Sequence, residues 1–437
     1  MSDKILVIGS GAREHSIVKA IERSSREVDV FCIASNMNPG IANLCTEFII
    51  DDFNNPKVVS RYANENDVSI GVIGPENPLS KGIADTLWDT KIKVVGPKKH
   101  LAQIETSKAF TRNLLKKYKI PGGPKYKVFN SISGVKDFLK ELGENYVVKF
   151  DGLAGGKGVK VAGDHLSSHS EALEYCKELI SKKQEFVIEE KFIGQEFSLM
   201  SFCDGDTLKH MPAVQDHKRA YENDKGPNTG GMGTYSDTGH SLPFLQKKDI
   251  EDAYKINQAT AEALKNEFKE GYKGILYGGF MATEEGVKLI EYNARFGDPE
   301  AMNVLSILET DFMDICDGIT MGKLEELDVT FKNKATVCKY AVPEGYPDNP
   351  VKGEIIDVSK IENEDLLFYA SVDIKNGVLI ESGSRTVAVV GVDDTIEKAE
   401  KIAEKEISKI QGPLFHRKDI GTNTLIQKRI KHMESLR

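Results

Sequence analysis

KFDGLAGGKGVKV, residues 149–161, is the stretch from which the fold can be argued, because it places a glycine-rich loop between two short apolar segments. It is not a Walker A loop, which needs a glycine five residues before Gly156–Lys157 and a Ser or Thr after them, whereas Asp151 and Gly158 stand there. A glycine-rich turn between strands can close as a flap over a triphosphate, with backbone N–H groups, Lys157 and Lys149 meeting the charge. A mobile hairpin tip is the alternative, and lysines on both sides of the glycines favour the flap.

A second polar stretch, EYNARFGDPE (291–300), follows directly on the apolar segment GVKLI (286–290). Alternate residues of a strand share a face, so we expect Glu291, Asn293 and Arg295 to point the same way if the strand persists. Carboxylate and amide oxygens suit Mg²⁺ held partly by protein and partly by phosphates, and an arginine suits a bidentate grip on a phosphate or carboxylate. A solvated strand end with an ion pair is the alternative, but it gives no reason for Asn293. The stretch therefore predicts a metal–phosphate site.

Two segments between these stretches are less specific. VIEEKFIGQEFSL (187–199) predicts two strands and a connector that can present backbone groups to an adenine, with Glu196 accepting the ribose hydroxyls; a solvated acidic edge is the alternative. QDHKRAYENDKGPNTGGMGTYS (215–236) is a polar loop of unusual length, which is either a binding surface or a disordered lid.

The first hundred residues have the alternating pattern of a doubly wound domain. Apolar strand segments separated by helical patterns occur at KILVI (4–8), VDVFCIA (28–34), SIGVIG (69–74) and KIKVVG (91–96), which indicates a parallel sheet. GSGAREH (9–15) opens the first helix and can bind a phosphate through backbone N–H groups and the helix dipole. It matches only half of the dinucleotide fingerprint, because Glu14 replaces the third glycine. A turn without a ligand is almost as well supported, and Arg13 favours an anion other than NAD.

The whole chain is predicted to be an α/β and α+β multidomain protein. The amphipathic segment 104–119 predicts a helix, and the mixed segment that follows contains a long helix at 249–269 and a hairpin around TEEG. The last hundred residues combine strand patterns with one helix at 395–411. The predicted domains are residues 1–103, doubly wound; 104–330, with a flap subdomain at about 121–192; and 331–437, a small β-rich α+β domain.

The bulk properties exclude several classes of protein. The 437 residues carry a formal charge of −9, whereas general binding to nucleic acid or to a membrane surface needs a basic excess. No apolar run reaches the ~18 residues of a membrane span, and the N-terminus lacks a signal-peptide core. The six cysteines form no CxxC pair, zinc spacing or disulfide framework. We expect a cytoplasmic protein with reduced thiols.

These stretches, in this order, resemble the glycinamide ribonucleotide synthetase family of ATP-grasp ligases, over essentially the whole chain. The glycine flap alone indicates only an ATP-grasp enzyme, whereas GPNTGGMG followed by RFGDPE is specific for the family. The segments that carry the resemblance are GSGAREH (9–15), GPENPL (74–79), DGLAGGKGV (151–159), QDHKR (215–219), GPNTGGMGTYS (226–236), RFGDPE (295–300) and RKDIG (417–421).

The resemblance implies a reaction of purine biosynthesis, in which ATP, glycine and 5-phosphoribosylamine give glycinamide ribonucleotide, ADP and phosphate through a glycyl phosphate. It implies ATP as co-substrate, Mg²⁺ or Mn²⁺ as cofactor, and glycine and 5-phosphoribosylamine as small-molecule substrates, with no nucleic-acid or membrane partner. We expect a monomer. Because the chain ends at Arg437, without the further catalytic domains of some eukaryotic relatives, we expect it to perform this step alone.

The resemblance also implies roles for residues of this chain. Glu291 and Asn293 match the metal ligands, and Asp216 and Arg295 are expected to act catalytically by orienting glycine and the phosphate groups. The expected ATP-binding positions are Lys108, Lys149, Gly152, Gly155, Gly156, Lys157 and Gly158, with Glu189, Glu190 and Lys191 at the adenine and Glu196 at the ribose. The expected substrate positions are Gly9, Gly11, Arg13, Glu76, Asn228, Gly230 and Gly231, which makes residues 1–103 the domain for the ribose phosphate substrate.

Two residues depart from the family pattern, and three other functions remain as alternatives. Phe150 stands where a small residue is usual and is expected to crowd the base of the flap, and His416 stands where an aromatic residue such as Tyr is usual.

A carboxylating or formylating ATP-grasp enzyme of the same pathway would share the flap and metal strand but not GPNTGGMG and RFGDPE. A decayed ligase with a regulatory role predicts loss of Glu291, Asn293 or Lys157, and all are present. A dehydrogenase is disfavoured by the incomplete dinucleotide fingerprint.

Overall fold

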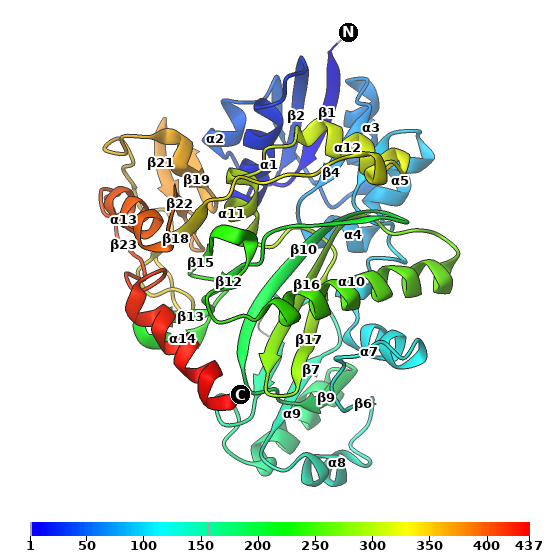
Figure 1. The fold of residues 1–437 in the computed structure, drawn as a ribbon. Coiled ribbons are helices and arrows are strands. Elements are labelled where there is room, and N and C mark those ends of the chain that lie inside the picture. The colour runs from blue at the N-terminus through cyan, green and yellow to red at the C-terminus, as the bar shows by residue number, and fades with distance from the viewer. Residues whose placement is uncertain (1, 156–157) are drawn as a thin grey trace.

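The computed structural model describes residues 2–155 and 158–437, and its N-terminal part is a parallel sheet covered by helices (Figure 1). The five strands lie in the order β3-β2-β1-β4-β5, as a doubly wound sheet requires. Strand order reverses between β1 and β4, so the turns after these two strands lie at the switch point where such sheets bind ligands. The elements are β1 (Asp3–Ile8), α1 (Ala12–Glu22), β2 (Val28–Ala34), α2 (Pro39–Ala42), β3 (Glu47–Ile50), α3 (Pro56–Glu65), β4 (Ile70–Ile73), α4 (Glu76–Lys81), α5 (Ile83–Asp89) and β5 (Lys93–Val95).

The segment predicted as one helix over 104–119 is instead two helices, α6 (Gln103–Thr106) and α7 (Lys108–Lys117). Ser107 between them has extended backbone, and its hydroxyl accepts a hydrogen bond from Phe110 N, which caps α7. The periodicity of the segment could not show this break, because a serine is tolerated within a helix and is preferred at its start.

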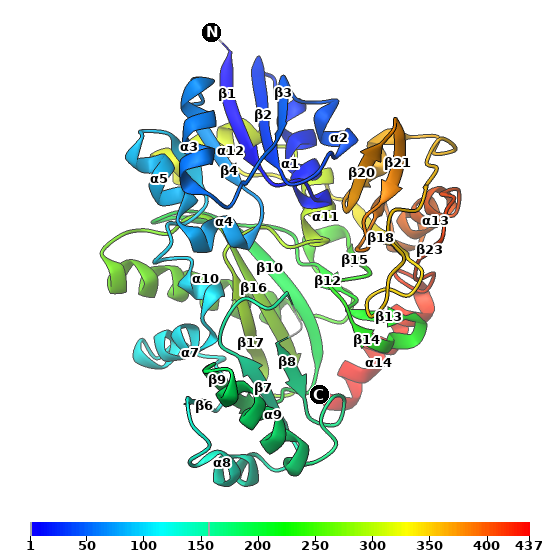
Figure 2. The same ribbon diagram turned by 180° about the vertical axis from the view of Figure 1, so that it is seen from behind.

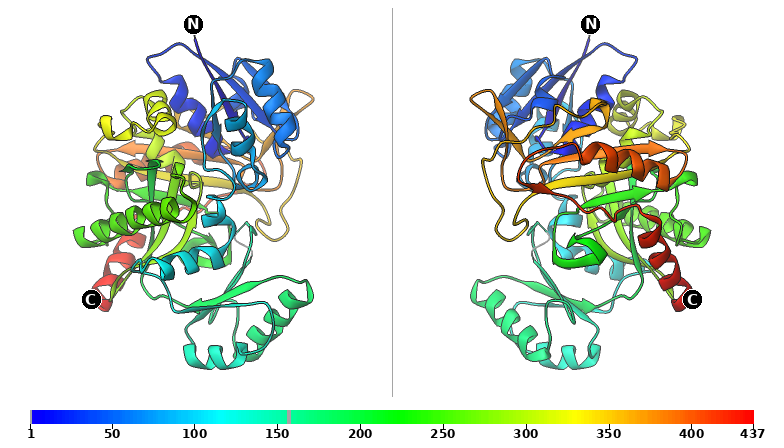
Figure 3. Two further views of the ribbon diagram at one scale, coloured as in Figure 1. Left: turned by 90° about the vertical axis from the view of Figure 1, so that its right-hand side faces the viewer. Right: turned by 90° about the vertical axis from the view of Figure 1, so that its left-hand side faces the viewer.

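A small subdomain with its own core follows α7 and lies at the lower end of the molecule (Figure 3). Its antiparallel sheet has the strand order β6-β9-β7-β8, and two helices pack against it through a cluster that includes Phe138, Tyr146 and Phe186. This separate core allows the subdomain to carry the glycine loop on the hairpin between two of its strands. The elements are β6 (Tyr126–Phe129), α8 (Val135–Leu142), β7 (Tyr146–Phe150), β8 (Val159–Val161), α9 (His169–Ser181) and β9 (Phe186–Glu190).

The central sheet has the order β11-β10-β16-β17 and is covered on one face by the long helix α10 (Lys247–Phe268). The buried hydroxyl of Tyr292 donates to Thr260 Oγ1 of this helix at 2.9 Å. Because neighbours in a strand point to opposite faces, Glu291 and Asn293 project from the other side of the sheet. The elements of this part are β10 (Gln195–Asp204), β11 (Leu208–His210), β16 (Lys273–Thr283), β17 (Gly286–Asn293), α11 (Glu300–Ser306) and α12 (Phe312–Met321).

The polar segment 215–236 folds as strands, of which β12 and β15 join the C-terminal sheet in the order β12-β15-β18-β22-β19, whereas β13 and β14 pair with each other. Figure 2 shows this sheet beside the N-terminal part, with α1 and α2 near β20 and β21. Lys19 of α1 contributes to that contact by donating to the carbonyl oxygens of Glu364 and Leu367 at 2.8 and 2.9 Å. The elements are β12 (Gln215–Asp216), β13 (Arg219–Tyr221), β14 (Lys225–Asn228), β15 (Gly233–Ser236), β18 (Ala335–Pro343), β19 (Leu367–Tyr369), β20 (Val372–Lys375), β21 (Val378–Glu381), β22 (Val387–Asp393), α13 (Ile396–Ile407), β23 (Leu414–Phe415) and α14 (Asn423–Leu436).

Candidate active site

The base of the glycine loop is fixed to the start of α7. The carboxylate of Asp151 accepts hydrogen bonds from Ser107 Oγ at 3.0 Å and from Ala109 N at 3.1 Å. Lys108 Nζ donates to the carbonyl oxygen of Gly152 at 2.7 Å. The loop therefore begins from a defined position beside a lysine expected at the ATP phosphates. Two other expected phosphate-binding residues, Gly156 and Lys157, lie outside the described residues.

Phe150 crowds the base of the loop, as expected from the sequence. A Cβ atom on Gly152 would lie 2.6 Å from ring carbons of Phe150, and one on Gly158 would lie 3.2 Å from Phe150 Cβ. Gly155 has φ +53°, in the left-handed region that favours glycine. A side chain at Gly152 would thus meet Phe150, one at Gly158 would meet first Ala154 Cβ at 2.8 Å and then Phe150, and Gly155 is favoured by its backbone conformation.

Glu291 lies in a field of positive charge. Burial by itself would raise its pKa, but Lys218, Lys149 and Lys108 lower it, and the pKa lies below its usual value. Glu291 therefore stays ionised at neutral pH, as a metal ligand must. Asn293 lies two residues further on the same strand. Because alternate residues of a strand share a face, the amide of Asn293 lies on the same face of the sheet as the carboxylate of Glu291.

Arg295 was expected on the same face only if the strand persists, and the strand does not persist, because β17 ends at Asn293. Arg295 instead contacts two carboxylates, with Nη2 at 3.0 Å from Glu105 Oε1 and Nε at 3.4 Å from Glu76 Oε2. Burial raises the pKa of Glu105, and Arg295 opposes that rise. The role of Glu105 was not predicted, because it lies in an ordinary helical pattern and meets Arg295 only through the fold.

The side chains expected near the adenine are occupied by protein partners. Glu189 accepts from Arg112 Nε at 2.7 Å and Nη2 at 2.9 Å, and it also pairs with Lys149. Glu190 Oε2 accepts from the backbone of Lys125 at 2.8 Å, and Lys191 Nζ donates to the carbonyl oxygen of Ala162 at 2.8 Å. Side chains of this segment thus hold the subdomain together, and the backbone N–H groups of Glu190 and Lys191 donate to the carbonyl oxygens of Lys125 and Asn145 at 3.0 and 3.1 Å.

A second group of acids, of which Glu300 is buried, lies around Lys218. Lys218 forms an ion pair with Glu196, the residue expected at the ribose. Burial raises the pKa of Asp216 well above its usual range, Glu300 adds to that rise, and Lys218 opposes it. Tyr277 donates to Glu300 at 2.8 Å. Glu300 was missed as a site residue, although it is the last acid of RFGDPE.

At the N-terminal switch point, Glu14 explains the incomplete dinucleotide fingerprint. Its carboxylate accepts from Gly11 N at 2.6 Å and lies against Gly9. Arg13 donates to Glu14 at 2.6 Å and to the carbonyl oxygen of Phe296 at 3.2 Å. The carboxylate of Glu14 therefore occupies a backbone N–H group of the turn. Arg13 and the following helix connect this turn to the RFGDPE segment.

The segment GPNTGGMG is held against RFGDPE by Arg385, a residue that the sequence did not single out. Arg385 Nη1 donates to the carbonyl oxygens of Gly230 and Asp298. Gly231 has φ +113°, and a Cβ atom there would lie 2.6 Å from Asp216 Oδ1. Asn228 belongs to β14 and pairs with Arg219 in the neighbouring strand. The structure thus brings Asp216, Gly230 and Gly231 together.

Models of three domains of one family match the chain: phosphoribosylglycinamide synthetase N domain at residues 3–105, its ATP-grasp (A) domain at 106–301 and its C domain at 336–423. The chain belongs to the phosphoribosylglycinamide synthetase family. It is an ATP-dependent ligase that joins a carboxylate to an amine. The family, the fold class and the enzyme class predicted from the sequence are confirmed.

Relatives of this synthetase family match over their full length. A phosphoribosylamine–glycine ligase of Methanosarcina barkeri is 51% identical over 434 residues, covering 99% of this chain and 100% of the relative. One from Methanocaldococcus jannaschii is 50% identical over 444 residues, with 99% and 100% covered. The crystal structure of a phosphoribosylamine–glycine ligase from Thermotoga maritima has a TM-score of 0.81 at 28% identity, covering 95% of this chain and 99% of that one. These matches confirm the predicted function, a phosphoribosylamine–glycine ligase of purine biosynthesis.

The family segment RKDIG (417–421) has a structural role. Arg417 is buried and binds Asp419 through Nε and Nη2 at 2.9 and 2.8 Å, and its Nη1 donates to the carbonyl oxygen of Arg219 at 3.1 Å. Next to it, His416 Nε2 lies 3.1 Å from Glu404 Oε1, so the ring at this position makes a polar contact. The segment fixes the strands on which the synthetase carries QDHKR and GPNTGGMG.

The donor chemistry of the metal position fits a hard cation shared with phosphates. Within residues 2–155 and 158–437, no three His, Cys, Asp or Glu side chains gather as a metal cluster. One carboxylate and one amide, Glu291 and Asn293, therefore leave most ligand positions to other oxygens, which suits Mg²⁺ in nucleotide sites.

None of the helices in the described part of the chain has the length and apolar character needed to cross a membrane.

Proposed function

We propose that this synthetase activates the carboxylate of glycine with ATP and transfers the glycyl group to 5-phosphoribosylamine. A carboxylate oxygen of glycine attacks the γ-phosphorus, the bond to the β-γ bridging oxygen breaks, and ADP leaves. The amine nitrogen of the second substrate then attacks the carbonyl carbon of glycyl phosphate, loses a proton, and inorganic phosphate leaves. Glycinamide ribonucleotide, ADP and phosphate are the products. No enzyme nucleophile takes part.

The observation that carries this proposal is the cluster of three lysines around Glu291. Lys108, Lys149 and Lys218 lie close enough to this carboxylate to lower its pKa. Phosphoryl transfer needs positioning and neutralisation of charge rather than covalent catalysis, and this arrangement supplies both. Glu291 and Asn293 would hold Mg²⁺ or Mn²⁺, which when bound neutralises phosphate charge. The lysines would hold the phosphate oxygens during transfer.

The remaining positions are proposed from their place around this centre. The described glycines of the flap, Gly152, Gly155 and Gly158, would cover the triphosphate of ATP, and Gly156 and Lys157 are proposed for it from the resemblance. The backbone at Glu189–Lys191 would meet the adenine, and Glu196 the ribose. Gly9, Gly11, Arg13 and Glu76, at the switch point, would hold the ribose phosphate substrate.

Glycine is proposed to bind between the two family segments. Asp216, with Glu300 beside it, would receive the ammonium group, and Arg295 would orient the carboxylate or the phosphate attached to it. Asn228, Gly230 and Gly231 would form the adjoining backbone surface. The buried environment of Asp216 favours an interaction with a cationic substrate, because an added positive charge lowers its raised pKa.

A monomer in the cytoplasm is proposed as well. All six cysteines are free, and Cys32, Cys176, Cys203, Cys316 and Cys338 are buried. Free thiols suit a reducing compartment. Sedimentation of the purified chain at several concentrations tests the monomer, and a mass that rises with concentration would contradict it.

The experiment that tests the reaction is ADP release with Mg-ATP and glycine, with and without 5-phosphoribosylamine formed in situ from ribose 5-phosphate and ammonia. We expect ADP only when both co-substrates are present, and glycinamide ribonucleotide by mass. ADP released with another carboxylate but not with glycine would overturn the substrate and keep the ATP-grasp class. Absence of ADP under every condition would contradict an active ligase.

A further inference from the structure

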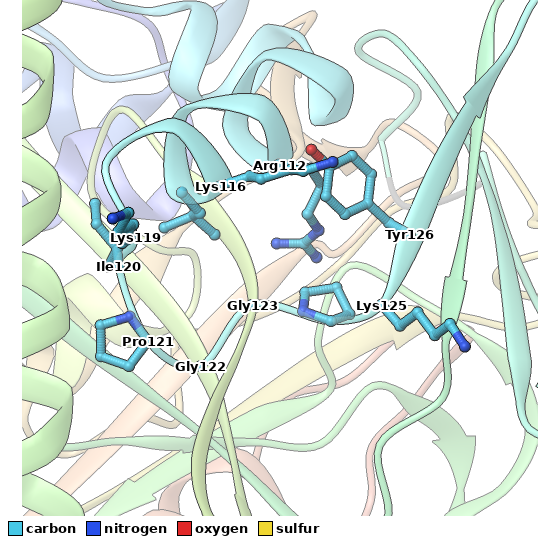
Figure 4. Close-up of a pocket in the computed structure, with 11 residues that line it drawn as sticks. Arg112, Lys116, Lys119, Ile120, Pro121, Gly122, Gly123, Lys125 and Tyr126 are labelled. Carbon is cyan, nitrogen blue, oxygen red and sulfur yellow. The ribbon is translucent and has the colours of Figure 1, made fainter.

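A cavity of about 470 Å³ lies beside the linker that joins α7 to the flap subdomain (Figure 4). Its volume is in the range of cavities that bind small molecules. It is lined by the end of α7, by the linker and by Tyr126 at the start of β6. None of the residues assigned above to ATP, glycine, the metal or the ribose phosphate lines it.

The charge of the cavity wall is of one sign. Arg112, Lys116, Lys119 and Lys125 line the cavity, and among the described lining residues there is no acid. Lys125 Nζ pairs with Glu141 at 2.6 Å, whereas Lys116 and Lys119 have no ion-pair partner in the described part of the chain. The wall therefore retains positive charge that an anion can neutralise.

Arg112 supplies a buried donor to this wall. Its side chain is 3% exposed, and Nε and Nη2 are used by Glu189 and by the carbonyl oxygen of Ile290. Nη1 is buried and has no hydrogen-bond partner among the described residues. Figure 4 shows the guanidinium directed toward the linker between Ile120 and Gly123. A buried N–H group without an acceptor is costly, so an acceptor that reaches it gains affinity.

The rest of the wall is apolar. Leu115, Ile120, Pro121 and Pro124 line the cavity together with the ring of Tyr126. A free inorganic ion would use the basic side chains and leave this surface uncovered. A molecule that carries a phosphate on an apolar or aromatic body would use both.

We propose that this cavity binds a small phosphate monoester, with its phosphate at Lys116, Lys119 and Nη1 of Arg112 and its organic part against the apolar wall. The site is separate from the proposed nucleotide site. Arg112 lies between the two, because it also binds Glu189 in the segment proposed to meet the adenine. This proposal does not depend on which amine or carboxylate the enzyme ligates.

Phenyl phosphate is a suitable probe, and its binding can be measured by calorimetry on the full chain saturated with Mg-ADP. We expect saturable binding, and about a tenfold or larger loss of affinity in the double variant Lys116→Gln/Lys119→Gln. Lys117→Gln is the matched control, because Lys117 lies on the same turn, pairs with Glu267 at 2.5 Å and does not line the cavity. The control should bind as the wild type does.

Several outcomes would overturn the proposal. Equal affinity in the double variant and the wild type would remove the lysines from the site, and an equal loss in Lys117→Gln would indicate a general charge effect. Binding of phenyl phosphate to the chain without nucleotide that is lost when the chain is saturated with Mg-ADP would assign the probe to the nucleotide site. Inorganic phosphate that binds as tightly as phenyl phosphate would exclude the organic part of the proposal.

Discussion

Arg385 binds both the backbone and the side chain of Asp298. Its Nη1 donates to the carbonyl oxygen at 2.8 Å, and its Nη2 lies 3.2 Å from Oδ2. The same Nη1 donates to the carbonyl oxygen of Gly230 at 2.6 Å, and the guanidinium lies 4.7 Å from the centre of the Tyr340 ring. Asp298 belongs to RFGDPE and Gly230 to GPNTGGMG, so one arginine of the C-terminal part joins the two segments most specific for the family.

Arg385→Lys is therefore predicted to disturb the glycine site more than the ATP site. A lysine cannot reproduce a planar fork that serves several acceptors at once. We expect the KM for glycine to rise about tenfold, since loss of one charged hydrogen bond costs ~1.5–3 kcal/mol, with little change in the KM for ATP. Steady-state kinetics measure both. Arg61→Lys, at an exposed arginine 3.9 Å from Asp51, is the control. Unchanged KM for glycine in Arg385→Lys would show that the clamp does not position the site.

Glu291→Ala is predicted to abolish turnover with only a modest loss of stability, because the carboxylate is proposed to hold metal rather than the fold. Removing it also leaves Lys149 and Lys218 without a shared counter-charge, and the protein should bind Mn²⁺ more weakly in the presence of ADP. Activity and Mn²⁺ binding by electron paramagnetic resonance check the two effects. Glu285→Ala serves as the control, because Glu285 lies at the exposed end of the same hairpin and pairs with Lys288 at 2.9 Å. Wild-type activity in Glu291→Ala would remove the metal assignment.

What the sequence predicted well was local. The alternation of β17 identifies Glu291 and Asn293 as neighbours on one face, and that prediction needs only the two-residue period of a strand. The glycine loop between β7 and β8 follows from the two apolar segments beside it. The doubly wound sheet follows from its alternating strands and helices.

What the sequence could not show depends on contacts between distant segments. Arg385 lies 87 positions from Asp298, and the residues around it give no sign of the partner. Glu105 meets Arg295 only after the N-terminal and central parts pack together. The break at Ser107 depends on Asp151, 44 positions away, which accepts from its hydroxyl. Periodicity carries no information about such pairs.

Stability at acid pH is predicted to depend on Glu189. Burial would raise the pKa of this carboxylate, but Arg112 and Lys149 lower it, and the pKa lies below its usual value. A depressed pKa in the folded state contributes stability above the unfolded value of ~4.3, and that contribution is lost as the pH falls through the folded pKa. Glu189→Gln should therefore unfold more easily at pH 7, by about 3–5 kcal/mol, with a difference from wild type that shrinks as the pH falls below ~4.

Urea unfolding of both proteins between pH 3 and pH 7 would measure this difference, with Glu174→Gln as the control. Glu174 is exposed on α9 and pairs with the exposed Lys177, so its replacement should change little at any pH. A difference between Glu189→Gln and wild type that stays constant over the whole range would contradict the assignment of the pH dependence to this carboxylate.

Gly152→Ala is predicted to impair the flap through Phe150. The added methyl group would lie 2.6 Å from the aromatic ring, closer than real contacts allow, so either the ring of Phe150 or the base of the loop must shift. We expect a rise in the KM for ATP and a lower kcat, because closure of the loop positions the phosphates. The double variant Phe150→Ala/Gly152→Ala removes the clash and should recover most of the activity relative to Phe150→Ala alone. Gly152 could instead be needed for close approach of the backbone to phosphate, and then Gly152→Ala will impair the enzyme equally with Phe150 and with Ala at position 150. A double-mutant cycle separates the two explanations.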